Sequence, residues 1–224
     1  KKIARIRSQE FLEGKWSKLY NKSNIPIDVI ISPEREVAKS LYRKLEAPGA
    51  LDNVPFIKDK VKLLEILIEK KCPIANIPLK DLSKKFPEFK AYIFGAERKE
   101  NFVYFKKSDQ MKVGDKVYVV VSTDQINKLL SVFGHNEKLA QKILIIGGGN
   151  IGLHLAKLLE ISGGLRIKII EKNKDRAEQI AGELSSSIVL CGDALDEKIL
   201  KEANIEEIET VFALTNDDED NIMV

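Results

Sequence analysis

Three glycines and one acidic residue have the spacing that binds the phosphates and ribose of a dinucleotide. Gly147, Gly149 and Gly152 follow an apolar run in the pattern GxGxxG, and a segment with helical periodicity comes next. A second apolar run ends in Glu171, 24 residues after Gly147. Strand, glycine turn, helix and an acid about 20 residues further on together form the dinucleotide-binding fingerprint.

Each position in this pattern has its own physical role. Gly147 permits the tight turn, Gly149 lets the backbone approach a pyrophosphate, and Gly152 lets the helix pack closely on the sheet. The helix that begins near Asn150 would direct unpaired amides and its positive dipole end at the phosphates. Glu171 would accept hydrogen bonds from two ribose hydroxyls and repel a phosphate there, which favours NAD or an adenosine nucleotide over NADP, although a lysine follows it. The alternative is a domain that keeps the turn for packing and has lost the ligand.

The elements around the fingerprint alternate between strand and helix, which predicts a parallel sheet. After Glu171 we expect a helix in KDRAEQIAGEL, a strand in SSIVLCGDA, a helix in DEKILKEANI and a strand in ETVFALT. Loops at the carboxyl ends of such strands hold the ligand in a doubly wound fold. The loop residues that we expect there are Asp193, Ala194, Thr215, Asn216 and Asp217.

The chain before the fingerprint begins with a short strand in KKIARIR and an amphipathic helix over residues 8–16. An apolar strand then leads to a helix with Ser32 as its N-cap and Pro33 in its first position, ending before Pro48. Apolar residues recur along one face of that helix, so the face needs a partner.

From Asn53 to Phe133 the pattern becomes rich in strands and predicts a small α+β module of about 80 residues. A closing helix should begin with Ser122 or Thr123 as its cap and stop at Gly134. Four aromatic residues of this module are interpreted as core or as a subunit contact rather than as a platform for stacking bases, so no nucleic-acid partner is expected. They are Phe94, Phe102, Tyr104 and Phe105.

The composition predicts a soluble, cytoplasmic protein. The chain has 224 residues, of which 44% are hydrophobic, and no apolar run approaches the roughly 18 residues that span a bilayer. No signal peptide is evident, and Cys72 and Cys191 lack the spacing of metal ligands. Residues 1–135 carry 27 Lys and Arg against 17 Asp and Glu, and residues 136–224 carry 10 against 17. Charges of opposite sign suit docking of the two parts on each other or on a partner.

These features together resemble the TrkA potassium uptake regulators, which carry two tandem RCK units, each a Rossmann lobe followed by a small C-terminal lobe. The resemblance covers essentially the whole chain. The matching segments are ARIRS at 4–8, ISPE at 31–34, APGALD at 47–52, KVGDKVYVVV at 112–121, IGGGNIG at 146–152, GDA at 192–194 and LTNDDEDNI at 214–222.

The resemblance implies an α/β fold with a Rossmann-like parallel sheet and a smaller α+β lobe. Residues 1–52 would be the tail of a first Rossmann lobe with its dimerising helices, and 53–134 the first C-terminal lobe. Residues 135–141 would be a linker, and 142–224 the front of a second Rossmann lobe. On this interpretation the chain is an interior fragment of a longer protein.

The resemblance also implies a regulatory subunit at the inner face of the cell membrane that binds NAD or NADH, or in some relatives ATP or ADP. Such a subunit assembles into a homo-oligomeric ring and gates a Trk-type potassium-translocating membrane subunit. Arg5 matches a nucleotide-contacting arginine whose glycine loop would precede Lys1. The candidate nucleotide-binding residues are Gly147, Gly148, Gly149, Asn150, Ile151, Gly152, Glu171, Lys172, Asp193, Ala194, Thr215, Asn216 and Arg5.

An NAD-dependent oxidoreductase is the alternative, because the same fingerprint serves hydride transfer. Such an enzyme needs a general acid or base near the nicotinamide. The imidazoles available are His135, in the linker, and His154, in the fingerprint helix, and no tyrosine follows Tyr118. We therefore expect no catalytic residue and no metal ligand in this chain.

Overall fold

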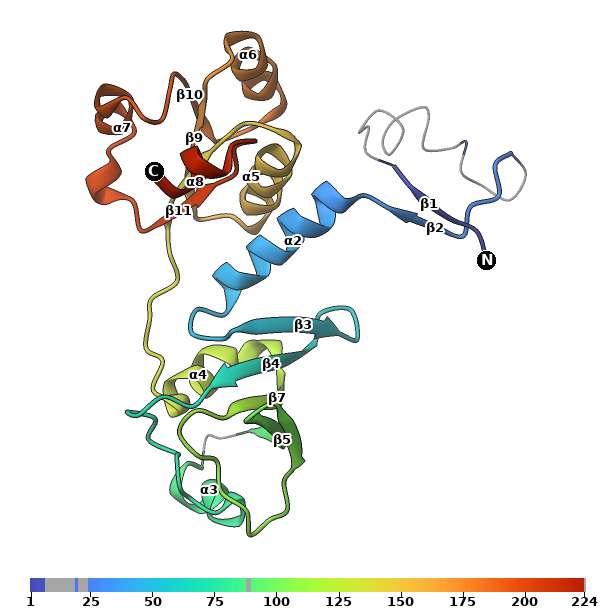
Figure 1. The fold of residues 1–224 in the computed structure, drawn as a ribbon, viewed down its shortest axis with the longest axis vertical. Coiled ribbons are helices and arrows are strands. Elements are labelled where there is room, and N and C mark those ends of the chain that lie inside the picture. Colours follow the sequence, from blue (N-terminus) through green and yellow to red (C-terminus); the bar gives the residue numbers. More distant parts are fainter. Residues whose placement is uncertain (7–18, 20–23, 88–89, 224) are drawn as a thin grey trace. The chain divides into compact units, whose positions relative to one another are not determined.

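The computed structural model describes residues 1–6, 19, 24–87 and 90–223, and the helix predicted over residues 8–16 lies outside them. The chain forms two compact units, one of residues 1–42 and 140–224 and the other of residues 43–139 (Figure 1). The finer division proposed from the sequence stays a prediction. The fold class is confirmed, because a parallel sheet and a separate antiparallel sheet are both present.

The parallel sheet has the strand order β10-β9-β8-β11. Its near-continuous apolar strands are typical of a sheet that is buried on both faces, and Ile143, Leu144, Ile145 and Ile169 are fully buried. The strands are β8 (Lys142–Ile146), β9 (Arg166–Glu171), β10 (Ile188–Cys191) and β11 (Thr210–Ala213).

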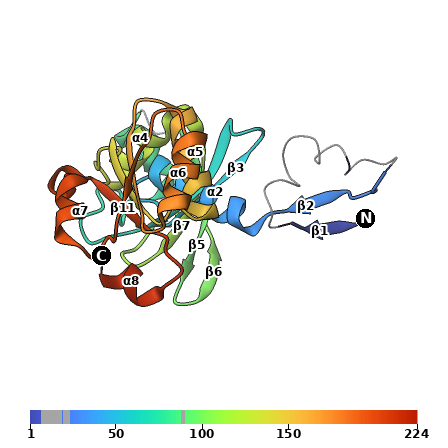
Figure 2. The ribbon, with the colours of Figure 1, turned by 90° about the horizontal axis from the view of Figure 1, so that it is seen from above.

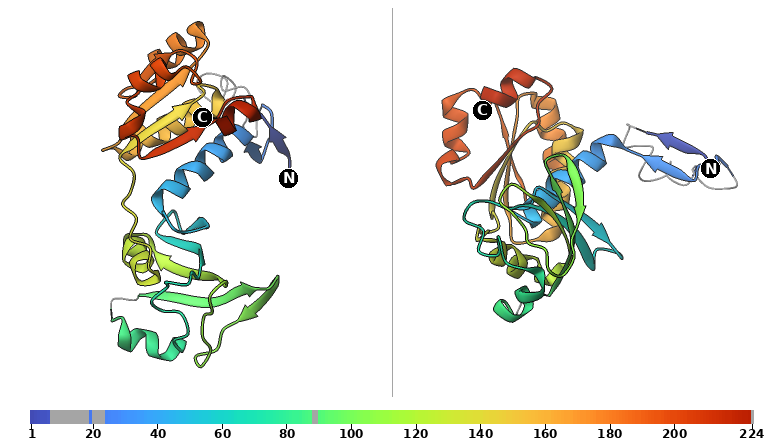
Figure 3. Two further views of the ribbon diagram at one scale, coloured as in Figure 1. Left: turned by 60° about the vertical axis from the view of Figure 1, so that its left-hand side comes forward. Right: turned by 60° about the horizontal axis from the view of Figure 1, so that its bottom comes forward.

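Helices cover both faces of this sheet. α5 and α6 contact the central strands on one side, and α7 lies on the other (Figures 2 and 3). On the α7 side, Ala203 packs in one apolar cluster with Leu144, Ile146 and Ile170. The helices are α5 (Asn150–Ser162), α6 (Lys174–Glu183), α7 (Glu197–Glu202), the 3-10 turn η3 (Ile205–Glu207) and α8 (Asp218–Met223).

Two short parallel strands, β1 (Ile3–Arg5) and β2 (Val29–Ile31), precede the helix α2 (Pro33–Glu46). Pro33 opens α2, as the sequence predicts. The predicted capping role of Ser32 is wrong, however, because its buried hydroxyl has no hydrogen-bond partner among the described residues. The backbone carbonyl of Ser32 still accepts a hydrogen bond from the amide of Glu36, so backbone geometry alone starts the helix.

The second unit is built on an antiparallel sheet with the strand order β3-β4-β7-β5-β6. One face of this sheet packs against α3 (Leu79–Lys85) and α4 (Ile126–Phe133), and Leu64, Ile66 and Val119 lie in the resulting core. The strands are β3 (Asp52–Phe56), β4 (Val61–Leu67), β5 (Ala91–Arg98), β6 (Asn101–Tyr104) and β7 (Lys116–Ser122).

The start of α4 differs from the prediction. A 3-10 turn, η2 (Thr123–Gln125), precedes α4, and the side chain of Ser122 makes no capping hydrogen bond. The hydroxyl of Thr123 instead donates to the carbonyl of Asp59 in the turn between β3 and β4. Gly134 does end α4, in the left-handed conformation with φ of 96°. The stop could be predicted because few residues other than glycine adopt that conformation.

Candidate functional site

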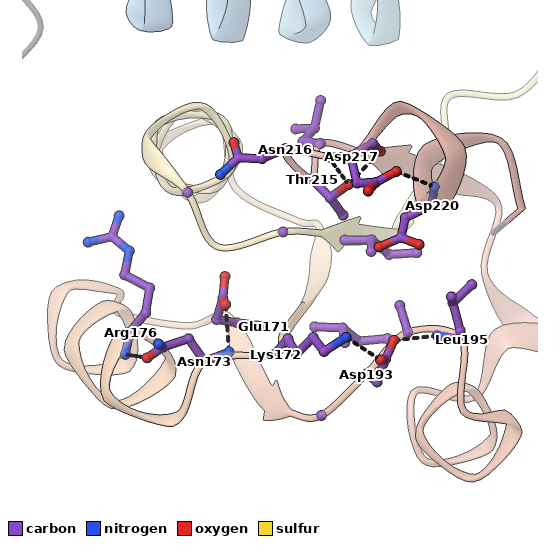
Figure 4. Close-up of a pocket in the computed structure, with 17 residues that line it drawn as sticks. Glu171, Lys172, Asn173, Arg176, Asp193, Leu195, Thr215, Asn216, Asp217 and Asp220 are labelled. Atoms are coloured by element: carbon purple, nitrogen blue, oxygen red, sulfur yellow. Dashed lines mark hydrogen bonds and ion pairs between the residues drawn. The ribbon is translucent and has the colours of Figure 1, made fainter.

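A pocket of about 610 Å³ opens at the carboxyl ends of the parallel strands (Figure 4). This edge is where doubly wound folds bind their ligands. The residues that line it come from the ends of β8 and β9, the glycine turn, the loops after β9, β10 and β11, and the first turns of α6 and α8: Ile146, Gly147, Gly149, Ile170, Glu171, Lys172, Asn173, Arg176, Gly192, Asp193, Ala194, Leu195, Leu214, Thr215, Asn216, Asp217 and Asp220.

The three glycines of the fingerprint have distinct surroundings. Gly147 adopts a φ of +105°, and a Cβ atom there would lie 2.6 Å from the carbonyl oxygen of Leu214. A Cβ at Gly152 would overlap the carbonyl oxygen of Gly147, so helix and turn meet only because Gly152 has no side chain. A Cβ at Gly149 would meet nothing within 4 Å. Packing therefore requires Gly147 and Gly152, whereas Gly149 faces open space in the pocket.

Glu171 ties the end of β9 to the glycine turn. Its Oε2 accepts a hydrogen bond of 2.7 Å from the amide of Gly148, and its Oε1 accepts one of 2.8 Å from the amide of Asn173. A carboxylate oxygen can accept more than one hydrogen bond. Each oxygen therefore keeps acceptor capacity toward the pocket while the backbone holds the side chain in place.

Arg176, in the first turn of α6, holds the next peptide group of the glycine turn, on the other side of the Gly148 α-carbon. Its Nε donates to the carbonyl of Gly148 at 2.8 Å, and its Nη1 donates to Gln179 at 2.8 Å. Its Nη2 is buried and has no hydrogen-bond partner within the described part of the chain. The sequence offers no signal for this residue, because an arginine on an amphipathic helix usually belongs to its solvated face.

Lys172 and Asp193 form an ion pair of 2.6 Å between the loops after β9 and β10. The amide of Leu195 also donates to Asp193, at 3.0 Å. The hydrogen bond from Lys172 lowers the pKa of Asp193, and the same contact raises the pKa of Lys172. The charge of Lys172 is thus already matched within the pocket wall.

The loop after β11 is ordered around Thr215. Asn221 accepts a hydrogen bond of 2.9 Å from the amide of Thr215 through its Oδ1 and donates to the carbonyl of Thr215 through its Nδ2. The carboxylate of Asp217 accepts a hydrogen bond of 2.8 Å from the amide of Glu219, at the start of α8. The hydroxyl of Thr215 lies 2.9 Å from the carbonyl oxygen of Asp217. These contacts hold Thr215, Asn216 and Asp217 at the rim (Figure 4).

The pocket collects most of the predicted residues. Gly148, Asn150, Ile151 and Gly152 shape the turn and the start of α5 without lining the pocket, and Arg5 lies in β1 and is not among the lining residues. Their roles in binding stay predictions. The predicted residues that line it are Gly147, Gly149, Glu171, Lys172, Asp193, Ala194, Thr215 and Asn216. Lining residues that the prediction lacked include Asn173, Arg176, Leu195 and Asp220.

The described residues contain no group of three or more His, Cys, Asp or Glu side chains that could hold a metal ion. None of the described helices is long and apolar enough to cross a membrane.

Comparisons with known proteins agree with this architecture. A TrkA-N domain matches residues 143–224, and a TrkA-C domain matches residues 63–134. The Trk system potassium uptake protein TrkA of Azorhizobium caulinodans is 43% identical over 99% of this chain and 49% of its own length. The protein of the same name from Vibrio alginolyticus is 36% identical over 99% of this chain and 48% of its own length. The chain thus spans about half the length of these relatives.

Solved structures share the fold. The crystal structure of the GsuK RCK domain superimposes with a TM-score of 0.58 at 18% identity, over 98% of this chain and 45% of that chain. The GsuK channel bound to NAD gives the same TM-score at 17% identity, over 98% of this chain and 37% of that chain.

Proposed function

Because this chain belongs to the TrkA family through its TrkA-N and TrkA-C domains, we propose that it is a nucleotide-binding regulatory part of a potassium uptake system. The observation that carries the proposal is the pocket lined by the glycine turn, which leads into α5, and by Glu171. The ligand that this arrangement fits best is NAD or NADH, with ATP or ADP as the other candidates.

The phosphates would bind at the glycine turn and the start of α5. No side chain caps this helix, whose N-cap is Gly149. The first amides of a helix are unpaired within it and carry the positive end of its dipole. Open space beside Gly149 gives a pyrophosphate access to them.

The ribose of the adenosine half would bind Glu171 through the acceptor capacity that its two backbone hydrogen bonds leave free. Beyond it, Ala194 and Leu195 offer apolar surface for a base. A phosphate on the 2′ hydroxyl would approach the charge of Glu171. Lys172 and Arg176 could offset that charge, but Lys172 is paired with Asp193 and Arg176 is bonded to Gly148. These contacts favour NAD over NADP.

The charge of the pocket also bears on the choice of nucleotide. Its titratable lining residues are four acids and two cations: Glu171, Asp193, Asp217, Asp220, Lys172 and Arg176. An excess of carboxylates favours a ligand with little negative charge. The pyrophosphate bridge of NAD carries less negative charge than a triphosphate, so the charge of the pocket supports NAD or NADH as the first candidate.

Regulation would follow from different contacts of the nucleotide in two arrangements of a homo-oligomeric ring. A ligand shifts a conformational equilibrium only by the difference between its affinities for the two states. On this proposal the ring lies at the inner face of the membrane and gates a Trk-type potassium-translocating subunit.

Hydride transfer, the alternative function, is less well supported, because neither His135 nor His154 is among the residues that line the pocket.

Calorimetric titration of the folded chain with NADH, NAD and ATP tests the proposal. We expect binding that Glu171→Ala weakens severely and that Glu178→Ala leaves unchanged. Glu178 is a matched control because it lies on α6 outside the pocket. Its ion pair with Lys174 spans 4.0 Å and is exposed, so it contributes little. If all three nucleotides fail to bind to folded wild-type chain, or if Glu171→Ala binds normally, the proposed site is wrong.

A further inference from the structure

A second, smaller pocket lies at the amino ends of the parallel strands, at the edge of the sheet opposite the nucleotide pocket. Its volume is about 100 Å³, and the turn between α7 and η3 forms one wall. The strands contribute three cations, since Lys142 begins β8, Arg166 begins β9 and Lys168 follows two residues later. One acid, Glu207, completes the charged lining, which therefore has a net charge of +2. It is called the cationic pocket below.

The three cations share one face of the sheet. Lys142 and Arg166 are direct partners in the ladder between β8 and β9. Arg166 and Lys168 are two residues apart on one strand, so all three side chains point to the same side. On this side Leu144 packs in one cluster with Ala203. Like charges that lie directly opposite each other destabilise a sheet, so the arrangement is unfavourable unless an anion lies among them.

The protein itself satisfies these cations only in part. Lys142 Nζ lies 2.9 Å from a carboxylate oxygen of Glu207, and Lys168 Nζ donates to the carbonyl of Ala203 at 2.8 Å. Arg166 is exposed, and its guanidinium has no hydrogen-bond or ion-pair partner among the described residues.

Glu207 acts as a resident counterion for the cationic pocket. The hydrogen bond from Lys142 lowers the pKa of Glu207, and the charges of Lys168 and Arg166 lower it further. All three cations thus act on one carboxylate. The side chain of Glu207 is 62% exposed, so it can turn out to solvent and leave its place to another anion.

We propose that the cationic pocket binds a phosphate group in place of Glu207, either as the free dianion or at the end of a small metabolite. A phosphate carries up to twice the charge of a carboxylate and has three strong acceptor oxygens. Arg166 can donate two parallel hydrogen bonds to it, and each lysine can donate another. One water takes up about 30 Å³ in the liquid, so 100 Å³ accommodates the phosphate group and little more.

The proposal does not rest on nucleotide binding, because the nucleotide pocket and the cationic pocket share no lining residue. A carboxylate ligand fits less well than a phosphate. It would bring only the single charge that Glu207 already supplies, and two oxygens for three cations.

Equilibrium dialysis of the whole chain with radiolabelled phosphate tests the proposal, at neutral pH and with chloride holding the ionic strength constant. We expect a dissociation constant below about 10 mM, and Arg166→Gln should raise it at least about fivefold because a charge-assisted contact is lost. Glu207→Gln should instead lower it, since the competing negative charge is gone. Both side chains are exposed, so the variants should stay folded by circular dichroism. Lys174→Gln is the control, because Lys174 is 80% exposed on α6 and lines neither pocket.

A glycine-turn variant locates the bound phosphate, because the nucleotide pocket also suits that anion. Gly149→Ala should leave phosphate binding unchanged, and Arg166→Gln should bind nucleotide as the wild type does. These two results keep the two proposals separate. Unlabelled glycerol phosphate distinguishes the two sources of the phosphate group, because it displaces the label only if the pocket admits a substituent on the phosphate.

Four results would overturn the proposal. They are a wild-type chain that binds no phosphate up to about 10 mM, equal affinities of the wild type and Arg166→Gln, weaker binding by Glu207→Gln, and an equal loss in Lys174→Gln. Loss of binding in Gly149→Ala without loss in Arg166→Gln would place the phosphate at the glycine turn and overturn it as well.

Discussion

The carboxylate of Glu171 accepts a hydrogen bond of 2.7 Å from the amide of Gly148, 23 residues earlier in the chain. Arg176 donates to the carbonyl of the same glycine. Two side chains of opposite charge, one at the end of β9 and one in α6, thus hold the peptide groups on either side of one residue in the turn. The acid expected to bind a ribose also fixes the shape of the loop expected to bind the phosphates, so the two functions are coupled.

Replacing Glu171 by Gln should weaken nucleotide binding more than it weakens the fold. Gln keeps one acceptor oxygen but loses the charge, and hydrogen bonds to charged groups contribute about 1.5–3 kcal/mol. We expect at least about tenfold lower affinity by calorimetry and about 1 kcal/mol less free energy of unfolding in urea. Glu178→Gln should change neither quantity. An unfolding loss without any loss of affinity would restrict Glu171 to a structural role.

Gly149→Ala and Gly152→Ala should separate binding from folding. The Cβ at Gly149 enters empty space, and the φ of −62° suits alanine, so the urea midpoint should not fall. Nucleotide affinity should fall, because the methyl group occupies the approach to the amides. Gly152→Ala places a methyl group on the carbonyl of Gly147, and we expect a loss of more than about 3 kcal/mol. Equal unfolding curves for the two variants would contradict the packing described for Gly152.

Glu160 should make the stability depend on pH in the acid range. Burial would raise its pKa, but the amides of Ser185, Ser186 and Ser187 and the Ser187 hydroxyl donate to the carboxylate and lower the pKa from 4.5 to about 2. A pKa lowered by folding contributes stability that is complete above pH 4.5 and disappears as the pH falls through 2.

Glu160→Gln tests this contribution, which we place at about 2 kcal/mol because the side chain is partly exposed. Urea unfolding of wild type and variant should differ by that amount at pH 6 and converge near pH 2. Glu178→Gln serves again as the control. A difference between wild type and Glu160→Gln that stays constant from pH 6 to pH 2 would contradict the prediction.

Removing only one partner of the ion pair between Arg98 and Asp115 should lower the free energy of unfolding strongly. Asp115 is 1% exposed, and Arg98 donates to both of its oxygens at 2.7 Å. Burial raises the pKa of Asp115, but the hydrogen bonds from Arg98 and from the amide of Lys112 lower it further than burial raises it. Arg98→Met leaves a buried carboxylate without its cation, which costs about 3–5 kcal/mol.

The double variant Arg98→Met with Asp115→Leu should lose less stability than Arg98→Met alone, because it removes the buried charge as well as its partner. Urea denaturation followed by circular dichroism measures both. A double variant less stable than the single one would mean that Asp115 contributes mainly through its bond to the amide of Lys112.

Asp193→Asn should relax the preference against NADP. It releases Lys172 from its ion pair beside Glu171, and a free cation there can partly neutralise a ribose phosphate. We expect the ratio of the NADP to the NAD dissociation constant to fall several-fold in calorimetric titrations. Lys201→Gln, which removes an exposed cation of α7 paired with Glu197, should leave the ratio unchanged. If Asp193→Asn leaves the ratio of the NADP to the NAD dissociation constant unchanged, the ribose does not bind beside Lys172.

Residue types alone predict the strands and helices of the parallel sheet and the glycine turn that joins β8 to α5. A buried strand that ends in GxGxxG needs glycine at the turn and at the helix contact, and that constraint is visible in residue types alone. For the same reason Gly134 marks the end of α4 and Pro33 the start of α2. Local backbone geometry dictates these residues, so no knowledge of distant contacts is required.

The folded structure is needed to identify contacts between side chains that lie far apart in the chain. It placed Arg176 on Gly148, paired Lys172 with Asp193, and turned the hydroxyl of Thr123 to Asp59 rather than to a helix end. It also left Tyr92 and Tyr104 exposed instead of in a core. Hydrophobic periodicity reports which face of an element is apolar, but a charged or aromatic side chain finds its partner only when separate elements come together.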